Sequence, residues 1–254
     1  MLNFGYSTPH LSNLNSMENL LLLHGALGAA PMLEPLKQKL QGQFLVHTLN
    51  FSGHGGRNLP QEPFSMDLFV RDILQFLDEK GIRSTHIFGY SMGGYAALCL
   101  ALQHPQLVKS VFTLATKFAW SPETAAKETQ LLNPGKLEEK VPKFAATLAQ
   151  RHAPQDWKQV MQRTAEMMLH LGSAPVLTAE ALQQVQAPVQ VAVGDRDNMV
   201  SVEETLWAYR SLPNASLLVL PATQHPLERV STQRLADEIG QFTGTLAVQS
   251  SVIL

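Results

Sequence analysis

Apolar residues along the chain form two alternating patterns, short continuous runs and longer stretches with helical spacing. The continuous runs occupy residues 19–24, 44–49, 85–88, 108–114, 189–193 and 217–220. Runs of this length are typical of strands that are buried on both faces of a parallel sheet. Between the runs, apolar positions repeat every three to four residues, as at Phe69, Ile73, Phe76 and Leu77. The alternation predicts an α/β fold with a doubly wound, mostly parallel sheet and right-handed crossovers.

The alternation of strand and helix patterns stops between the fourth and fifth runs. Residues 117–186 show helical patterns but no strand pattern. The best helical pattern spans residues 155–171, and its apolar stripe consists of Trp157, Val160, Met161, Thr164, Met167, Met168 and Leu171. Such a stripe is typical of an amphipathic helix packed on the body of a protein. Its methionines and tryptophan also suit an adaptable apolar pocket, and both interpretations can hold together. We therefore expect an α/β core built from residues 1–116 and 187–254, with a helical lid over residues 117–186.

Composition and charge exclude several classes of protein. The 254 residues carry a net charge of −2 and no runs of Lys or Arg, so nucleic acid is not the expected partner. No apolar stretch reaches the roughly 18 residues that a membrane span requires. Residues 1–15 lack the basic and apolar regions of a signal peptide, and the single cysteine, Cys99, allows neither an intramolecular disulfide nor a CxxC zinc site. We expect a cytoplasmic protein with a small-molecule substrate, no metal and no cofactor; its oligomeric state stays open.

The two ends of the chain carry little pattern. Residues 1–18 are polar and turn-rich, and an opening hairpin is barely visible there. Residues 246–254 are apolar and follow the last expected helix. They could dock on the body or add to the edge of a partner.

The third run leads into Gly89-Tyr90-Ser91-Met92-Gly93-Gly94, which contains the pattern G-x-S-x-G. To present a serine hydroxyl at the tip of a strand, the chain must turn sharply into a helix, here expected over residues 95–103. Bulky side chains two residues to either side of the serine would collide, so glycine is favoured there. Ser91 is therefore the candidate nucleophile, whereas Cys99 is expected to be a small buried hydrophobe of the following helix.

A serine nucleophile needs a base, an acid that orients the base, and donors for the developing oxyanion. Among the nine histidines, His225 is the one in a loop that follows a late strand. The acid is expected after the fifth run, in Gly194-Asp195-Arg196-Asp197, where two aspartates compete and one of them serves the turn. No Asp or Glu follows the fourth run, which ends in Leu114-Ala115-Thr116-Lys117.

The order Ser91, Asp195 or Asp197, His225 resembles that of the α/β-hydrolase fold superfamily in its lidded single-domain form. The resemblance covers roughly residues 19–242 and rests on His24-Gly25-Ala26-Leu27-Gly28, Gly53-His54-Gly55, the serine turn, Gly194-Asp195-Arg196-Asp197 and His225. It implies that Asp197 is the acid, because the acid is usually the last residue of G-x-x-D. It also implies an oxyanion hole made by the backbone N–H groups of Ala26 and Met92. His24 and His54 are then structural or pocket-shaping residues.

This set of residues predicts a serine hydrolase that cleaves an ester or thioester of a small to medium acyl substrate through an acyl-enzyme. We expect Tyr90, Trp120, Trp157 and Met161 to contact the substrate. One alternative on the same triad is a lyase similar to those of the menaquinone pathway, although those usually have Arg where Tyr95 stands. A carbon–carbon bond hydrolase, usually with Asn at the position of Tyr90, and a perhydrolase are further alternatives. A non-catalytic ligand-binding receptor of this fold is the alternative from another class.

Overall fold

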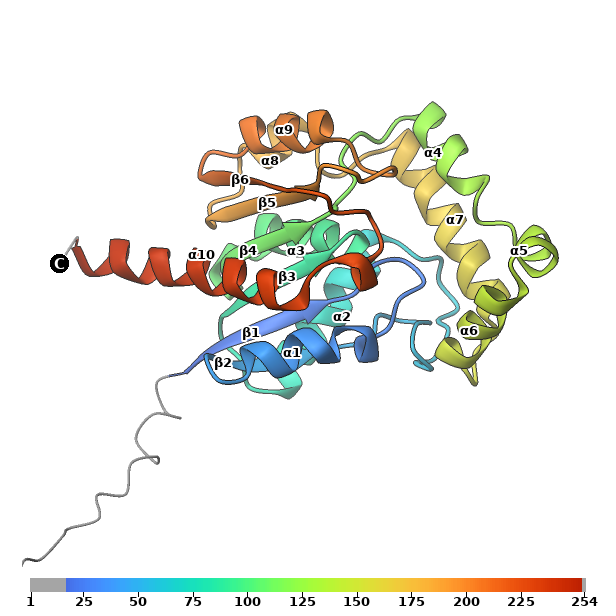
Figure 1. The fold of residues 1–254 in the computed structure, drawn as a ribbon, viewed down its shortest axis with the longest axis horizontal. Coiled ribbons are helices and arrows are strands. Elements are labelled where there is room, and N and C mark those ends of the chain that lie inside the picture. Colours follow the sequence, from blue (N-terminus) through green and yellow to red (C-terminus); the bar gives the residue numbers. More distant parts are fainter. Residues whose placement is uncertain (1–16, 253–254) are drawn as a thin grey trace, which may run out of the picture.

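The computed structural model describes residues 17–252, and it describes side chains for residues 17–244. The expectations about a signal peptide and an opening hairpin fall on residues outside this range. Six strands form one sheet with the order β2-β1-β3-β4-β5-β6 (Figure 1). The strands are β1 (Glu18–Leu23), β2 (Phe44–Thr48), β3 (Thr85–Tyr90), β4 (Val108–Leu114), β5 (Val189–Gly194) and β6 (Ala215–Leu220). Every neighbouring pair is parallel, which confirms the predicted fold class.

Helices cover both faces of the sheet. On one face lie α1 (Glu34–Leu40) and α10 (Thr232–Val252); on the other lie α2 (Met66–Glu79), α3 (Met92–Gln103) and α9 (Val202–Ser211) (Figure 1). Ser65 caps α2 by accepting a hydrogen bond from the Leu68 N–H, as its position before an apolar helix suggests. Single turns of 3₁₀ helix occur at η2 (Ala30–Leu33), η3 (Pro105–Leu107) and η4 (Leu227–Arg229).

Alternate residues of the central strands point into two separate apolar clusters. Leu22 and Phe88 pack toward α1 and α10, whereas Leu21 and Ile87 pack toward α2 and α3. All six residues of β3 are buried, so this strand lies in the middle of both clusters. Burial on both faces explains why the strands appear in the sequence as continuous apolar runs. Because β3 is held on both faces, the turn that follows it has a defined position.

The segment between β4 and β5 forms α4 (Pro122–Thr129), α5 (Pro134–Lys140), α6 (Pro142–His152), α7 (Trp157–Ser173) and α8 (Ala179–Leu182). Figure 1 shows α4 to α7 gathered beyond the carboxyl ends of the strands. Helix α4 packs along α7, and α8 packs against α9. We call residues 117–186 the helical insertion.

The C-terminal segment differs from the prediction. Residues 246–252 continue α10 rather than following it, so the last helix runs through Val252. Gly240 and Gly244 keep a right-handed helical backbone, and no proline interrupts the segment, so nothing ends the helix earlier. Within residues 17–252, no helix combines the length and the apolar character needed to cross a membrane.

Candidate active site

Ser91 occupies the turn between β3 and α3, and its backbone is strained. Its φ of 51° and ψ of −116° lie in a region that non-glycine residues rarely adopt. Two hydrogen bonds from the end of β4 hold the turn: the Ser91 N–H donates to the Leu114 carbonyl at 2.8 Å, and the Thr116 hydroxyl donates to the Ser91 carbonyl at 3.0 Å. The strain is therefore maintained by the neighbouring strand.

The glycines around Ser91 allow close approach of backbones. A Cβ atom at Gly89 would lie 2.4 Å from the Cα and N atoms of Gly94. One at Gly94 would lie 2.1 Å from Thr116 Oγ1, and one at Gly93 would lie 2.6 Å from the Leu23 carbonyl oxygen. The glycines of the motif thus serve the packing of the turn against both neighbouring strands.

His225 and Asp197 are joined directly. His225 Nδ1 lies 2.8 Å from Asp197 Oδ2, while Asp197 Oδ1 accepts hydrogen bonds from the N–H groups of Met199 and Val200, each at 2.8 Å. Burial favours a higher pKa for Asp197, but its contacts with His225 and the two N–H groups outweigh burial, and the pKa lies below its ordinary value. Asp197 is therefore ionised near neutral pH and can stabilise a charged imidazole.

Asp195, the competing aspartate, lies in the same turn but bonds to a backbone N–H group and not to His225. Its Oδ1 accepts a hydrogen bond from the Thr223 N–H at 3.2 Å, and its side chain is exposed. The structure thus brings Asp197, and not Asp195, to His225.

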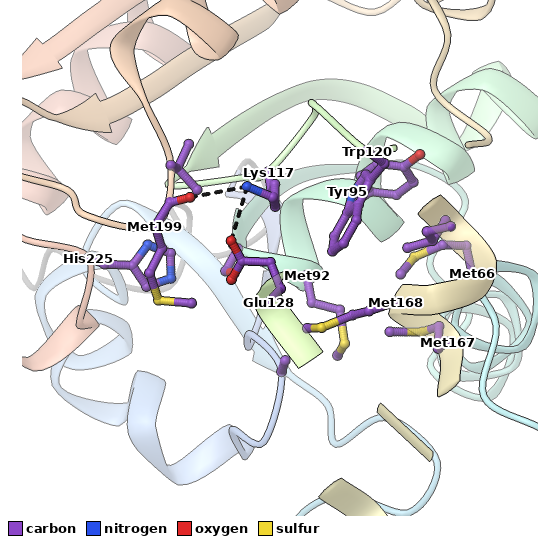
Figure 2. A pocket seen from close by; sticks show the side chains of 14 residues that line it. Met66, Met92, Tyr95, Lys117, Trp120, Glu128, Met167, Met168, Met199 and His225 are labelled. Atoms are coloured by element: carbon purple, nitrogen blue, oxygen red, sulfur yellow. Dashed lines mark hydrogen bonds and ion pairs between the residues drawn. The ribbon is translucent and has the colours of Figure 1, made fainter. Parts of the chain in front are cut away.

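Ser91 and His225 both line a cavity of about 50 Å³. Figure 2 shows His225 with other side chains of the cavity wall. The wall is mainly apolar, and five methionines of the described chain contribute to it: Met66, Met92, Met167, Met168 and Met199. Leu171 and Trp120 add further apolar surface. Unbranched thioether side chains adapt readily to irregular shapes, so this wall suits flexible apolar groups.

Ala26 and Met92, the predicted oxyanion donors, both line this cavity next to Ser91. Met92 is the first residue of α3, so its N–H has no acceptor within the helix and lies at the positive end of the helix dipole. The loop that carries Ala26 passes close to the serine, because a Cβ atom at Gly25 would lie 3.2 Å from Ser91 Cβ. The arrangement can present two N–H groups to a negatively charged oxygen.

The four residues expected to bind substrate have different positions. Trp120 lines the cavity, whereas Tyr90, Trp157 and Met161 do not belong to its lining. Trp157 and Met161 are 7% and 1% exposed and pack in the core cluster. The same helix does meet the cavity, but through Met167, Met168 and Leu171 near its end. The sequence contained this signal, since all these residues belong to one stripe, but it did not show which end of the stripe faces the serine.

Tyr90 supports the histidine loop. Its hydroxyl donates to the His225 carbonyl oxygen at 2.9 Å, and the two ring centres lie 5.6 Å apart. Burial raises the pKa of the Tyr90 hydroxyl, so the group stays protonated and remains a donor. The residue before Ser91 thus contacts the loop of the candidate base directly.

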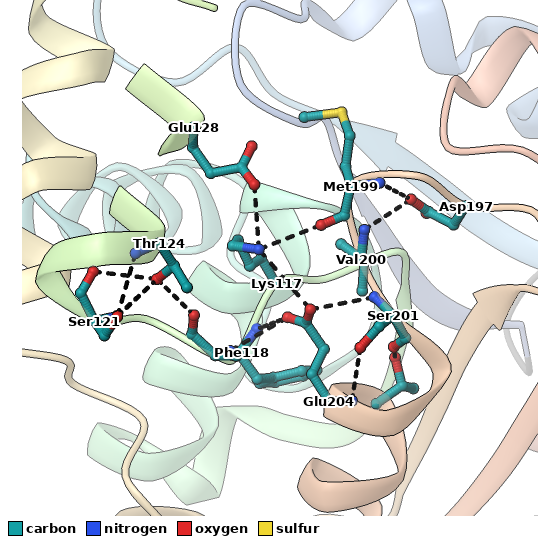
Figure 3. Close-up of polar contacts among 12 residues, drawn as sticks. Lys117, Phe118, Ser121, Thr124, Glu128, Asp197, Met199, Val200, Ser201 and Glu204 are labelled. Atoms are coloured by element: carbon teal, nitrogen blue, oxygen red, sulfur yellow. Dashed lines mark hydrogen bonds and ion pairs between the residues drawn. The ribbon is translucent and has the colours of Figure 1, made fainter. Parts of the chain in front are cut away.

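A charged cluster that the sequence did not single out borders the cavity (Figure 3). Lys117 Nζ lies 3.3 Å from Glu128 Oε1 and 3.8 Å from Glu204 Oε2, and it donates to the Met199 carbonyl at 3.2 Å. Lys117 directly follows Thr116 after β4, where many polar site residues of α/β folds lie, and this position was the available signal. Its partners come from α4 and α9, which no spacing in the sequence connects with it.

His24, His54 and Cys99 are buried, and none of them lines the cavity. His24 Nδ1 donates to the Gly25 carbonyl at 2.8 Å, and Nε2 accepts from the Phe51 N–H at 3.2 Å. Burial lowers the pKa of His24 to about 4 and that of His54 well below its ordinary value, so both rings are neutral. Burial also raises the pKa of the Cys99 thiol, which makes it a poor nucleophile. In the described part of the chain, no group of three His, Cys, Asp or Glu side chains is arranged to hold a metal ion.

Comparison with known proteins agrees with this fold. The family model of the alpha/beta hydrolase fold matches residues 18–171, which is more than half of the chain. The protein therefore belongs to the α/β-hydrolase fold family.

Two curated relatives align along nearly the whole chain. A 2-(acetamidomethylene)succinate hydrolase of Mesorhizobium japonicum is 22% identical over 94% of this chain and 93% of its own. A pimeloyl-[acyl-carrier protein] methyl ester esterase of Aeromonas hydrophila is 24% identical over 89% of this chain and 95% of its own. Among solved structures, the enol-lactonase of Burkholderia xenovorans LB400 has a TM-score of 0.73 at 19% identity, covering 92% of this chain and 94% of its own. At an identity of 19%, the likeness to this solved structure shows a shared fold and nothing about the substrate.

Proposed function

We propose that this α/β hydrolase is a serine hydrolase that cleaves esters or thioesters of small to medium acyl groups. The observation that carries the proposal is the shared cavity of Ser91 and His225, together with the 2.8 Å contact between His225 and the buried Asp197. A strained serine, a histidine and an ionised carboxylate in this chain order are the parts required for acyl transfer.

In the proposed mechanism, Ser91 Oγ attacks the carbonyl carbon of the substrate while His225 Nε2 takes the serine proton. Asp197 holds Nδ1 and stabilises the imidazolium ion that forms. The negative charge that develops on the carbonyl oxygen is bound by the N–H groups of Ala26 and Met92. His225 then gives its proton to the leaving alcohol or thiol, and the acyl group stays on Ser91.

Water completes the cycle. His225 removes a proton from a water molecule, the resulting hydroxide attacks the acyl-enzyme, and the carboxylic acid leaves as Ser91 is protonated again. No cofactor takes part in these steps.

The size and lining of the cavity support the choice of substrate class. A volume of about 50 Å³ suits a short acyl chain, and the methionine-rich wall can adjust to a somewhat longer one. We further propose that the helical insertion acts as a lid, since Trp120, Met167, Met168 and Leu171 all come from it and line the same cavity as Ser91.

A panel of p-nitrophenyl esters with acyl chains of increasing length, together with matched thioesters, tests this function. We expect turnover by the wild-type protein with a preference for short to medium chains, and loss of turnover in the Ser91→Ala variant. The tested variants must retain the wild-type circular dichroism spectrum. Turnover no higher than that of Ser91→Ala would indicate a ligand-binding protein and would overturn the proposal.

A further inference from the structure

One part of the cavity wall is charged. Ser91 and His225 share their cavity with one lysine and one acidic residue of the described chain, Lys117 and Glu128. Their side chains are only 15% and 12% exposed. Both also line a neighbouring hollow of about 330 Å³, whose other members include Lys127, Asn198 and Ser201. The Lys117–Glu128 pair therefore stands in the wall between the apolar cavity and a polar hollow.

The Lys117 ammonium group makes one hydrogen bond and two ion pairs. It donates to the Met199 carbonyl at 3.2 Å, and it lies 3.3 Å from Glu128 Oε1 and 3.8 Å from Glu204 Oε2 (Figure 3). One positive charge thus faces two carboxylates, which gives the three side chains a net charge of −1. In this state Lys117 is a poor partner for an anionic substrate.

The two carboxylates have different tasks. Glu204 accepts hydrogen bonds from the N–H groups of Phe118, Ala119 and Ser201, so it is part of the framework that joins the loop after β4 to α9. Glu128 lies on α4 of the helical insertion and contacts the Lys117 side chain across the cavity wall. Glu128 is therefore the partner whose charge can be removed without loss of these backbone contacts.

We propose that Glu128 is a specificity-determining residue: together with Glu204 it outweighs the charge of Lys117, and it thereby restricts the cavity to acyl groups without a carboxylate. This inference rests on the proposed function. A carboxylate at the far end of an acyl chain would lose its hydration in the apolar cavity and would meet Glu128 as a like charge. An uncharged chain of the same shape meets neither penalty.

The test compares two esters with the same acyl skeleton, p-nitrophenyl hemiadipate and p-nitrophenyl 6-methylheptanoate. For each protein variant, the measured quantity is the ratio of kcat/KM for the anionic ester to kcat/KM for the neutral ester. In Glu128→Gln, we expect this ratio to rise at least about tenfold, because Lys117 then faces one carboxylate instead of two and the like charge in the cavity wall is gone. In the double variant Lys117→Met/Glu128→Gln, the gain should disappear, because Glu204 alone then leaves the same local charge of −1 as in the wild type.

Glu138→Gln is the matched control. Glu138 also lies in the helical insertion and forms an ion pair, with Lys158 at 2.8 Å, but it is exposed and lies outside the cavity lining. The control changes the net charge of the protein by the same amount, so its ratio should stay at the wild-type value.

An unchanged ratio in Glu128→Gln, or an equal rise in Glu138→Gln, overturns the inference while the proposed function stands. A parallel fall of kcat/KM for both esters, with a lower Tm, also overturns it, because Glu128 would then only tie α4 to the core. Failure of the wild-type protein to hydrolyse either ester or to react with a fluorophosphonate overturns the proposed function and this inference together.

Discussion

Replacement of Asp197 by asparagine removes the charge next to His225 and leaves the shape of the side chain almost unchanged. The amide oxygen can still accept the N–H groups of Met199 and Val200, which bond to Oδ1 of the aspartate at 2.8 Å. The amide NH₂ group then faces His225 Nδ1. Since two donors cannot bond to each other, the histidine must place its proton on Nε2 and can no longer accept the serine proton there.

The size of the effect follows from the contact that is lost. A carboxylate and an imidazolium ion whose charges are about 4 Å apart interact by about 4 kcal/mol at an effective dielectric constant of about 20. The side chain of Asp197 is fully buried, so solvent screens this interaction little. The lost interaction and the wrong tautomer of His225 act together, so we expect kcat/KM to fall by about 10³-fold to 10⁴-fold.

The assay is hydrolysis of p-nitrophenyl acetate near neutral pH, with Asp195→Asn as the control. Asp195 lies two residues away, and its replacement removes the same charge, but its carboxylate bonds to the Thr223 N–H and not to His225. We expect Asp195→Asn to retain activity within about threefold, since it disturbs one exposed hydrogen bond. Equal losses in the two variants, or full activity of Asp197→Asn, would refute the assigned role of Asp197.

Three further predictions concern the turn, the histidine loop and acid stability. Gly89→Ala should lower the free energy of unfolding by about 3 kcal/mol or more, because its Cβ would lie 2.4 Å from Gly94 Cα; urea denaturation with a wild-type midpoint would contradict this. Tyr90→Phe loses the hydrogen bond to the His225 carbonyl and should lower kcat about fivefold on p-nitrophenyl acetate; an unchanged kcat would show that the bond does not position the histidine. The neutral His24, with a pKa of about 4 against an ordinary 6.5, stabilises the fold above pH 6.5 and loses this effect as the pH falls toward 4. Urea denaturation should detect a loss of up to about 3 kcal/mol over that range, and a flat profile would rule it out.

The fold could be predicted well from the sequence where both faces of an element are buried. Burial on both faces makes the central strands continuous apolar runs, and β4 matches its run at both ends. Elements whose ends contain glycine or polar residues were predicted too short. β3 continues through Gly89 because this glycine pairs with Thr113 of β4, and α3 begins at Met92, directly after the strained serine. β6 begins at Ala215, since backbone pairing with Val189 needs no apolar side chain.

The candidate site could be predicted in part, for a related reason. Ser91, Asp197 and His225 each follow a strand, and parallel strands bring their carboxyl ends to one edge of the sheet. The cavity wall depends instead on how the helical insertion packs. Which end of α7 faces the serine, and which acid contacts Lys117, are set by packing between segments far apart in the sequence.

Covalent labelling of Ser91 is the most direct test of the account. The protein is incubated with a fluorophosphonate, and intact mass and peptide mapping then locate the adduct. We expect one adduct per chain on the peptide that contains Ser91, no adduct in Ser91→Ala, and a much slower reaction in His225→Ala. Labelling of Ser91→Ala at the wild-type rate, or no labelling of the wild-type protein, would contradict the assignment of Ser91 as the nucleophile.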